Sequence, residues 1–502
     1  MNSNASLTKA ALLIKNSILS FAGRIIPLFV GLVAIPILID MLGVTRFGIL
    51  TLAWVFIGYA NIFDFGISRA GVKFISDCIG ENNESDIPLI FWTLTIVLFS
   101  IGIIIAIILY LISSDLVPFI VEANDALNIE VLYVIRIVAI TLPIVLLISG
   151  INAYLTAYQS FKWISSIQVF NGILNYALPV LVLLLYDGLI PVMITLFTIK
   201  AFVLGLYIFS IRKLQFNSVS FPTFSFRYMK ELVKFGGWVS VSNVLSPLVD
   251  YIDRFYIAFI MGASVVAYFT TPMDVLFKLG IIPVSIAAVL FPVVSNLSNT
   301  DKGKAISFTV TGTNLTLIIL FPVAMVLQLF TSELLELWVG PEFAVNSTLV
   351  AQILLIGIFL KSFTNYSITY LHGIGKPKQT AVVHIAQSIL YVIVLYYAVK
   401  EFELLGAAII HTLRLLADYY LMNILVYRDL DKWKQNCRKS IFGITVSAFI
   451  LAGMIFIDEL SVKILLSFIL IPFSIYISWH LLIDGKVKQT LLNQIPDRLS
   501  RD

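Results

Sequence analysis

Apolar runs of roughly 20 residues, the length that an α-helix needs to cross a bilayer, recur along the whole chain and restrict its fold more than any other feature. Hydrophobic residues make up 59% of the 502 positions and charged residues 12%, whereas about 25% of a soluble domain is charged. Only helices and closed barrels satisfy every backbone group inside lipid, and barrel strands alternate over about 10 residues. The sequence therefore predicts an all-α polytopic membrane protein.

The apolar runs predict about 14 transmembrane helices. The first has no short apolar core followed by a small-residue cleavage site, so we expect a retained helix and not a signal peptide. The expected spans are 17–41, 47–75, 87–113, 131–157, 162–186, 189–212, 229–261, 265–298, 305–331, 348–373, 379–399, 404–427, 439–458 and 462–483.

Lys and Arg residues fall mainly on one side of this arrangement. The side that holds the N-terminus carries 23 of them, and the opposite side carries only Arg46, Lys400 and Lys463. Cytoplasmic loops of membrane proteins carry the excess of Lys and Arg. We therefore expect both termini to lie in the cytoplasm.

Two landmarks repeat along the chain at nearly the same spacing. Gly43 and Gly262 each follow a long apolar helix and lie 219 residues apart, and Tyr154 and Tyr370 lie 216 residues apart. This spacing indicates a duplication of about six helices per copy, around an axis along the membrane normal because six is even. We expect an N-terminal lobe at 1–213, a cytoplasmic linker at 214–234, a C-terminal lobe at 235–428, and helices 13 and 14 with a cytoplasmic tail at 429–502.

Seven Lys and Arg residues remain inside the expected helices. Each would cost about 2.5 to 3.5 kcal/mol at the bilayer centre if it faced lipid, so most must face the bundle interior or a water-filled cavity. Arg136 lies near the outer end of its helix and can reach the headgroups. The remaining six predict a net positive cavity that favours an anion such as a phosphate or diphosphate: Arg24, Lys200, Arg254, Lys278, Lys361 and Arg414.

Acidic residues and histidines inside the helices are the candidates for ion coupling. Three cations have an acid one turn away, in the pairs Asp250 with Arg254, Asp274 with Lys278, and Arg414 with Asp418. Such pairs either neutralise each other on one helix or take part in function, and the sequence leaves both readings open. His384 is more typical of a hydrogen-bonded packing residue. The candidates for proton or sodium coupling are Asp64, Asp250, Asp274, Asp418 and His411.

Metal and nucleotide chemistry have no support in the sequence. Cys78 and Cys437 are the two cysteines, each near an expected inner helix end, so we expect neither a disulfide nor a metal site. No GxxxxGK[ST] motif is present. We expect no catalytic residue and no cofactor other than a proton or sodium gradient.

Two segments carry a resemblance to a known family. LGVTRFGILTLAWVFIGYANIFDFGISRAGVKFIS, which begins at Leu42, and FGGWVSVSNVLSPLVDYIDRFYIAFIMGASVVAY, which begins at Phe235, resemble the second and seventh helix regions of Wzx-type O-antigen flippases. These belong to the multidrug/oligosaccharidyl-lipid/polysaccharide exporter (MOP) superfamily. The resemblance implies two six-helix lobes around a central cavity with two extra C-terminal helices.

The resemblance also implies a function. The expected substrate is an undecaprenyl-diphosphate-linked oligosaccharide, which is flipped from the cytoplasmic to the periplasmic leaflet of the bacterial inner membrane by alternating access. The implied partners are this lipid-linked oligosaccharide, membrane lipid, a polysaccharide polymerase and a chain-length regulator, with no nucleic acid. A diphosphate carries about two negative charges, and the cationic interior would compensate them.

Two alternatives remain at this stage. One is a drug or metabolite exporter of the same superfamily, which would expel cations by proton or sodium antiport and would favour an acidic cavity. The other is a membrane polymerase or glycosyltransferase. Such an enzyme would be expected to carry a large outer loop, whereas the longest outer loop here has only about 15 residues.

Overall fold

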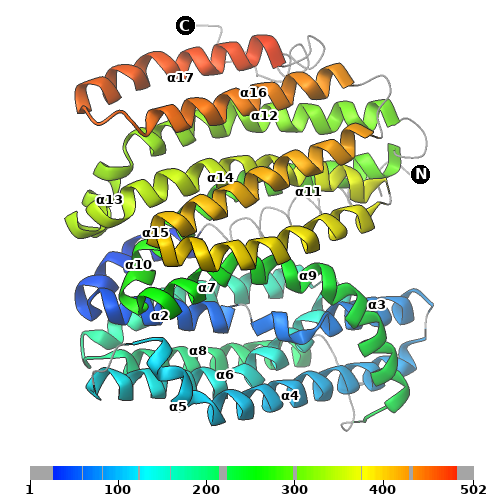
Figure 1. Ribbon diagram of the computed structural model, residues 1–502. Coiled ribbons are helices and arrows are strands. Elements are labelled where there is room, and N and C mark those ends of the chain that lie inside the picture. The colour runs from blue at the N-terminus through cyan, green and yellow to red at the C-terminus, as the bar shows by residue number, and fades with distance from the viewer. Residues whose placement is uncertain are drawn as a thin grey trace, which may run out of the picture. The chain divides into compact units, whose positions relative to one another are not determined.

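Helices account for all the regular structure in the described part of the chain (Figure 1). Among the described residues, nine helices are long and apolar enough to cross a membrane, and three shorter apolar helices lie at Ile26–Leu42, Val44–Gly58 and Leu460–Tyr476. The all-α polytopic membrane fold is therefore confirmed. The computed structural model describes residues 26–58, 60–81, 83–121, 125–158, 160–213, 223–297, 302–374, 376–428 and 434–482.

The chain forms two compact units, Met1–Ala267 and Tyr268–Asp502. In the first unit, α4, α6 and α8 run alongside one another (Figure 1). After the helix Ile26–Leu42, the elements up to the end of this unit are α2 (Val44–Gly58), η1 (Ala60–Asp64), α3 (Ile67–Gly80), η2 (Glu84–Asp86), α4 (Ile87–Leu111), α5 (Ser113–Leu116), η3 (Val117–Phe119), α6 (Asp125–Ala157), α7 (Phe161–Leu183), α8 (Leu189–Lys213), α9 (Phe226–Met261) and α10 (Ala263–Phe277), which crosses the boundary.

The second unit contains the helices that carry most of the predicted charged residues. In it, α12 packs against α14, α16 and α17, and α14 packs against α15. Each of the fourteen expected spans corresponds to one described helix or to part of a longer or broken one. The elements after α10 are η4 (Lys278–Gly280), α11 (Ile281–Leu297), α12 (Lys302–Leu329), α13 (Thr331–Val339), α14 (Pro341–Gly373), α15 (Pro377–Arg428), α16 (Lys434–Met454) and α17 (Leu460–Leu482).

The beginning of α9 is anchored in the first unit. The backbone N–H of Ser225 donates to Thr93 Oγ1 at 3.0 Å, and the Tyr228 hydroxyl donates to Asp86 Oδ2 at 3.0 Å. Burial and this hydrogen bond raise the pKa of Tyr228, which precedes the expected span, to about 12. α9 also packs against α3 and α4. The expected division at 214–234 stays a prediction, because residues 214–222 lie outside the described chain.

The second and eighth expected helices are both broken. Gly43 and Gly262 have positive φ angles of 77° and 87° and directly precede α2 and α10, so the repeated sequence landmark corresponds to two similar turns. Between α2 and α3, Phe65 and Gly66 adopt φ angles of 47° and 70°, the left-handed region. The short helix η4 separates α10 from α11. Each break exposes backbone groups inside an apolar segment, which membrane proteins tolerate where protein or water can satisfy them.

The expected helices 11 and 12 form one folded-back element, α15. Its turn is at Glu403, the one residue of α15 with non-helical angles (φ 55°, ψ −137°). Gly406 makes the turn tight, because a Cβ at this position would lie 2.0 Å from the carbonyl oxygen of Ala398. The two halves of α15 therefore face each other from Pro377 to Arg428.

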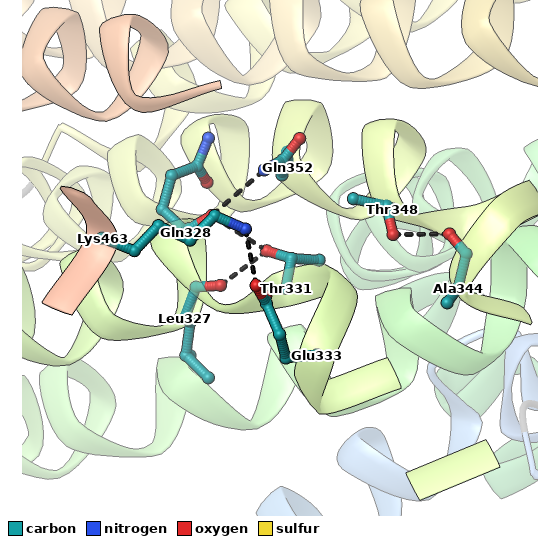
Figure 2. Close-up of polar contacts among 8 residues, drawn as sticks. All are labelled: Leu327, Gln328, Thr331, Glu333, Ala344, Thr348, Gln352 and Lys463. Atoms are coloured by element: carbon teal, nitrogen blue, oxygen red, sulfur yellow. Dashed lines mark hydrogen bonds and ion pairs between the residues drawn. The ribbon is translucent and has the colours of Figure 1, made fainter. Parts of the chain in front are cut away.

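A polar cluster at the expected outer end of α12 connects the last helix, α17, to the other helices of the second unit (Figure 2). Lys463 of α17 is only 5% exposed, and its ammonium donates to Glu333 Oε1 of α13 at 2.8 Å. Nearby, the Gln352 amide of α14 donates to the backbone carbonyl of Gln328 at 3.1 Å. A charge removed from water this far needs such a partner, so the ion pair fixes α17 against α13.

Candidate functional site

Three predicted residues of the second unit are brought together in one chain of contacts. Lys361 Nζ lies 5.2 Å from the ring centre of Phe277, and that ring lies 6.2 Å from the imidazole of His411. The hydroxyl of Tyr391 is 3.2 Å from His411 Nδ1, and the Arg414 guanidinium lies 4.9 Å from the Tyr391 ring centre. We call Lys361, Phe277, His411, Tyr391 and Arg414 the cation–aromatic cluster.

The folded-back form of α15 explains how this cluster forms. Tyr391 lies before the turn at Glu403, and His411 lies after it, so the turn brings the two side chains face to face. His411 is fully buried, at 0% exposed. Lys361 comes from α14, the main packing partner of α15, and Phe277 is the last residue of α10.

The chemistry of the cluster suits a bound anion. A cation over an aromatic face gains about 0.5 to 2 kcal/mol. A hydrogen bond from a charged donor is worth about 1.5 to 3 kcal/mol, so a phosphate oxygen can compete with a ring for the same cation. Rings also exclude water around Lys361 and Arg414, which strengthens the attraction of both charges for an anion.

Asp418 has a partner that the sequence did not predict, and its expected pairing with Arg414 stays a prediction. The ion pair of Asp418 is with His384, whose Nε2 lies 3.2 Å from Asp418 Oδ1. The Gln387 amide, in its hydrogen-bonding orientation, donates to the same oxygen at 3.2 Å. The reason is the turn in α15, which offers Asp418 a partner from the facing half that sequence spacing along one helix does not reveal.

The expected pair of Asp274 with Lys278 falls across a change of helix type. The two residues are four apart, but α10 ends at Phe277 and Lys278 begins the tighter turn η4. The pair therefore does not lie on one continuous α-helix, as the i,i+4 rule assumes, and its pairing stays a prediction. The Lys278 side chain is exposed.

In the first unit, the predicted cations have different surroundings. The Lys200 ammonium donates to Asn171 Oδ1 of α7 at 3.0 Å, a neutral partner. Arg254 is 2% exposed, and its guanidinium lies 4.8 Å from the ring centre of Tyr251. Arg24 lies outside the described residues, and so does the side chain of Asp250.

Asp64 lies at the break between α2 and α3. It is 8% exposed, its Oδ1 accepts the Gly66 N–H at 2.6 Å, and its Oδ2 accepts the Ser149 hydroxyl of α6 at 3.2 Å. Ser68 Oγ lies 2.8 Å from Ser149 Oγ. Hydrogen-bond donors and the beginning of α3 thus surround this carboxyl group. Among the described residues, no group of three or more His, Cys, Asp or Glu side chains could hold a metal ion.

Sequence reasoning missed Phe277, Tyr391 and the role of His384. A signal for two of them was present, because Tyr391 and His411 lie equally far from Glu401, as do His384 and Asp418. An antiparallel hairpin centred near Glu401 pairs both sets of residues. The position of the turn was needed to use that signal.

Known proteins resemble the chain in sequence and in fold. A family model described as "Polysaccharide biosynthesis protein" matches residues 13–298, more than half of the chain. A Shigella flexneri protein named "Putative O-antigen transporter" is 29% identical over 430 residues, which cover 83% of this chain and 98% of that protein. The resemblance stated from the sequence is thus confirmed.

Solved structures of the MOP superfamily share the fold. The structure titled "Lipid II flippase MurJ, inward closed conformation" aligns with a TM-score of 0.71 and 16% identity, covering 95% of this chain and 100% of that chain. An inward-facing multidrug resistance MATE family transporter of the MOP superfamily aligns with a TM-score of 0.65 and 14% identity, covering 82% of this chain and 98% of that chain.

Proposed function

Because the chain belongs to the polysaccharide biosynthesis protein family, we propose that it is a flippase for undecaprenyl-diphosphate-linked oligosaccharide. It moves a polysaccharide repeat unit, such as that of O-antigen, from the cytoplasmic to the periplasmic leaflet by alternating access. The observation that carries this proposal is the cation–aromatic cluster, in which Lys361 and Arg414 lie on aromatic rings around the buried His411.

The charge of the substrate is the main barrier to its passage. A single charged side chain at the bilayer centre costs at least about 2.5 kcal/mol, and a diphosphate carries about two charges. Lys361 and Arg414 offer compensating charges on neighbouring helices, α14 and α15. We assign the diphosphate to these two cations. The charge argument alone assigns the same diphosphate-binding role to Lys200, Arg254, Arg24 and Lys278.

Energy for directed transport would come from a proton or sodium gradient. Asp64, Asp274, Asp418 and His411 stay proposed coupling residues, together with Asp250. The proposed location is the bacterial inner membrane, and the excess of Lys and Arg on one side supports an orientation with both termini in the cytoplasm. A polysaccharide polymerase and a chain-length regulator are the proposed partners, because they would use the flipped repeat unit.

A cation-expelling exporter is the second candidate, since a MATE family transporter shares the fold. A cationic drug would have to bind beside Lys361 and Arg414, which repel it. The cluster therefore favours the anionic substrate over this alternative.

Translocation in proteoliposomes tests the proposal. The purified chain is reconstituted with a fluorescent polyprenyl-diphosphate disaccharide, and a membrane-impermeant quencher reports its arrival in the opposite leaflet. We expect faster translocation than in protein-free liposomes, and no acceleration for a matched neutral polyprenyl lipid. Equal acceleration of both lipids would refute a diphosphate site. Export of a cationic dye with no movement of the diphosphate lipid would establish the exporter instead.

A further inference from the structure

The beginning of α9 crosses its neighbours instead of running beside them. In Figure 1 this part of α9, the green turns at the lower right, is steeply inclined to α4 and lies across the neighbouring ends of α3 and α4. The helix begins at Phe226, directly after Ser225, whose backbone N–H donates to Thr93 Oγ1 of α4. Leu232 is buried in a core cluster with residues of α3, α4 and α6. We call residues 224–234 the crossing segment.

The contacts of the crossing segment with α4 indicate its depth in the membrane. Thr93 lies six residues after the first residue of α4, and at about 1.5 Å per residue the contact of Ser225 is about 9 Å from the beginning of that helix. The acids Glu84 and Asp86 come just before α4, where an expected span begins. Amphipathic helices that lie in a membrane surface enter the boundary between headgroups and acyl chains by about 5 to 10 Å. The crossing segment therefore lies at the level of such a helix.

Three kinds of side chain occupy three separate stripes of the crossing segment. Residues three, four and seven apart share a face of a helix. Tyr228 and Leu232 form the stripe that packs against the first unit. An apolar stripe and a basic stripe lie next to each other on the remaining surface, and at their border Lys230 Nζ is 4.9 Å from the ring centre of Phe226. The apolar stripe consists of Phe226, Met229 and Val233, and the basic stripe consists of Arg227, Lys230 and Lys234.

The apolar stripe contains large side chains that the protein does not cover. Phe226 is 60% exposed and Val233 is 48% exposed, and Phe224, just before α9, is 49% exposed. Contact with acyl chains stabilises such side chains, whereas contact with water does not. The basic stripe has the opposite requirement, because charges are costly in the acyl region. The two stripes together therefore fit the boundary between lipid and water.

The basic stripe carries more positive charge than the chain around it balances. Arg227 Nε lies 3.2 Å from Glu231 Oε1. In the described part of the chain, neither Lys230 nor Lys234 has an ion pair. The sequence from 214 to 249 contains no acidic residue other than Glu231. Two ammonium groups thus lie beside a lipid-facing stripe without an acid from the same part of the chain.

We propose that the crossing segment is a binding site for anionic phospholipid in the leaflet on the expected cytoplasmic side. Its apolar stripe contacts the acyl chains, and the long side chains of Lys230 and Lys234 reach the phosphates of phosphatidylglycerol or cardiolipin headgroups. Because hydrogen bonds to Thr93 and Asp86 hold this segment on α4, a lipid bound here stabilises the position at which α9 begins. The inference does not depend on which substrate the protein transports.

Spin labels measure the depth of the two stripes in liposomes of phosphatidylcholine and phosphatidylglycerol. They are attached to Phe226→Cys and to Lys234→Cys, each in a full chain that also carries Cys78→Ser and Cys437→Ala. We expect the Phe226→Cys label to collide more with oxygen, which dissolves in lipid, and the Lys234→Cys label to collide more with a water-soluble nickel chelate. If both labels meet the nickel chelate equally, the segment lies in water. If the Phe226→Cys label meets neither reagent, a protein surface covers it. Either result overturns the proposal.

Removal of two lysines tests the contact with the headgroup. Native mass spectrometry measures the affinity of the purified full chain for cardiolipin and for phosphatidylcholine. The test variant carries Lys230→Gln and Lys234→Gln. The matched control carries Lys378→Gln and Lys439→Gln, which remove the same net charge from two exposed lysines on the same expected side of the membrane.

Each lysine near an anionic membrane surface contributes about 5-fold to binding, so we expect the test variant to bind cardiolipin about 25-fold more weakly than the wild type. Its affinity for phosphatidylcholine, and the affinity of the control for both lipids, should stay within about twofold of the wild type. An equal loss of cardiolipin binding in the control would show that net charge alone attracts the lipid, which refutes a local site. Unchanged cardiolipin binding in the test variant refutes it as well.

Discussion

Replacement of Lys361 by methionine is the most direct test of the cation–aromatic cluster. Methionine keeps a long apolar side chain beside Phe277 and removes the charge, so the packing of α14 should persist. A hydrogen bond from a charged donor contributes about 1.5 to 3 kcal/mol. Since about 1.4 kcal/mol is a factor of ten in affinity, we expect farnesyl diphosphate to bind roughly 10- to 150-fold more weakly.

Nanodisc calorimetry measures this affinity, and the proteoliposome assay measures the accompanying loss of translocation rate. Lys400→Met is the matched control, because Lys400 is an exposed lysine on α15 and lies outside the cluster. Its affinity should stay within about twofold of the wild type, as surface substitutions away from a site have small effects. If Lys361→Met binds as the wild type does while its thermal unfolding is unchanged, the diphosphate does not bind at Lys361.

Three further predictions concern the scaffold and the topology. Gly406→Ala should lower the free energy of unfolding by about 2 kcal/mol or more, because its Cβ would lie 2.0 Å from a backbone carbonyl oxygen. Gly453→Ala is the control, since open space surrounds Gly453, and thermal unfolding should show no such loss for it. Lys463→Met should cost about 2 kcal/mol in the same assay, because it leaves Glu333 without its charged hydrogen-bond donor. A membrane-impermeant maleimide should label Cys78 only from the cytoplasmic side, slowly at pH 7 and faster as the pH rises, because burial and nearby carboxylates raise the pKa of its thiol. Labelling from the periplasmic side would contradict the expected orientation.

The positions of the helices could be predicted from the sequence because apolar length alone decides which segments cross a bilayer. The break at Phe65 and Gly66 was not predicted. A glycine two residues after an aspartate in an apolar run is by itself a weak signal of a helix break. At this break the Asp64 carboxylate accepts from the Gly66 N–H and from Ser149, which lies on another helix, and the sequence alone does not reveal the second contact.

The charged residues of the site could be found from the sequence, but their partners could not. The cost of a charge in lipid identifies Lys361 and Arg414 wherever they point. The i,i+4 rule, however, assumes one continuous helix, whereas α10 ends one residue before Lys278. The rule also cannot reveal the facing half of α15, which offers His384 to Asp418. The partner of a buried charge depends on distances in the folded protein, which spacing along the sequence does not give.

A single turn places the cation–aromatic cluster and the His384–Asp418 contact on the same hairpin. The contacts of Tyr391 with His411 and of His384 with Asp418 both join the two halves of α15, so any shift of one half against the other changes both. Gly406 keeps the halves close at the turn and therefore determines the geometry of both contacts. Glycine at this position thus serves the geometry of the cluster as well as stability, so farnesyl diphosphate should bind more weakly to Gly406→Ala than to the wild type even at a temperature where the variant stays folded.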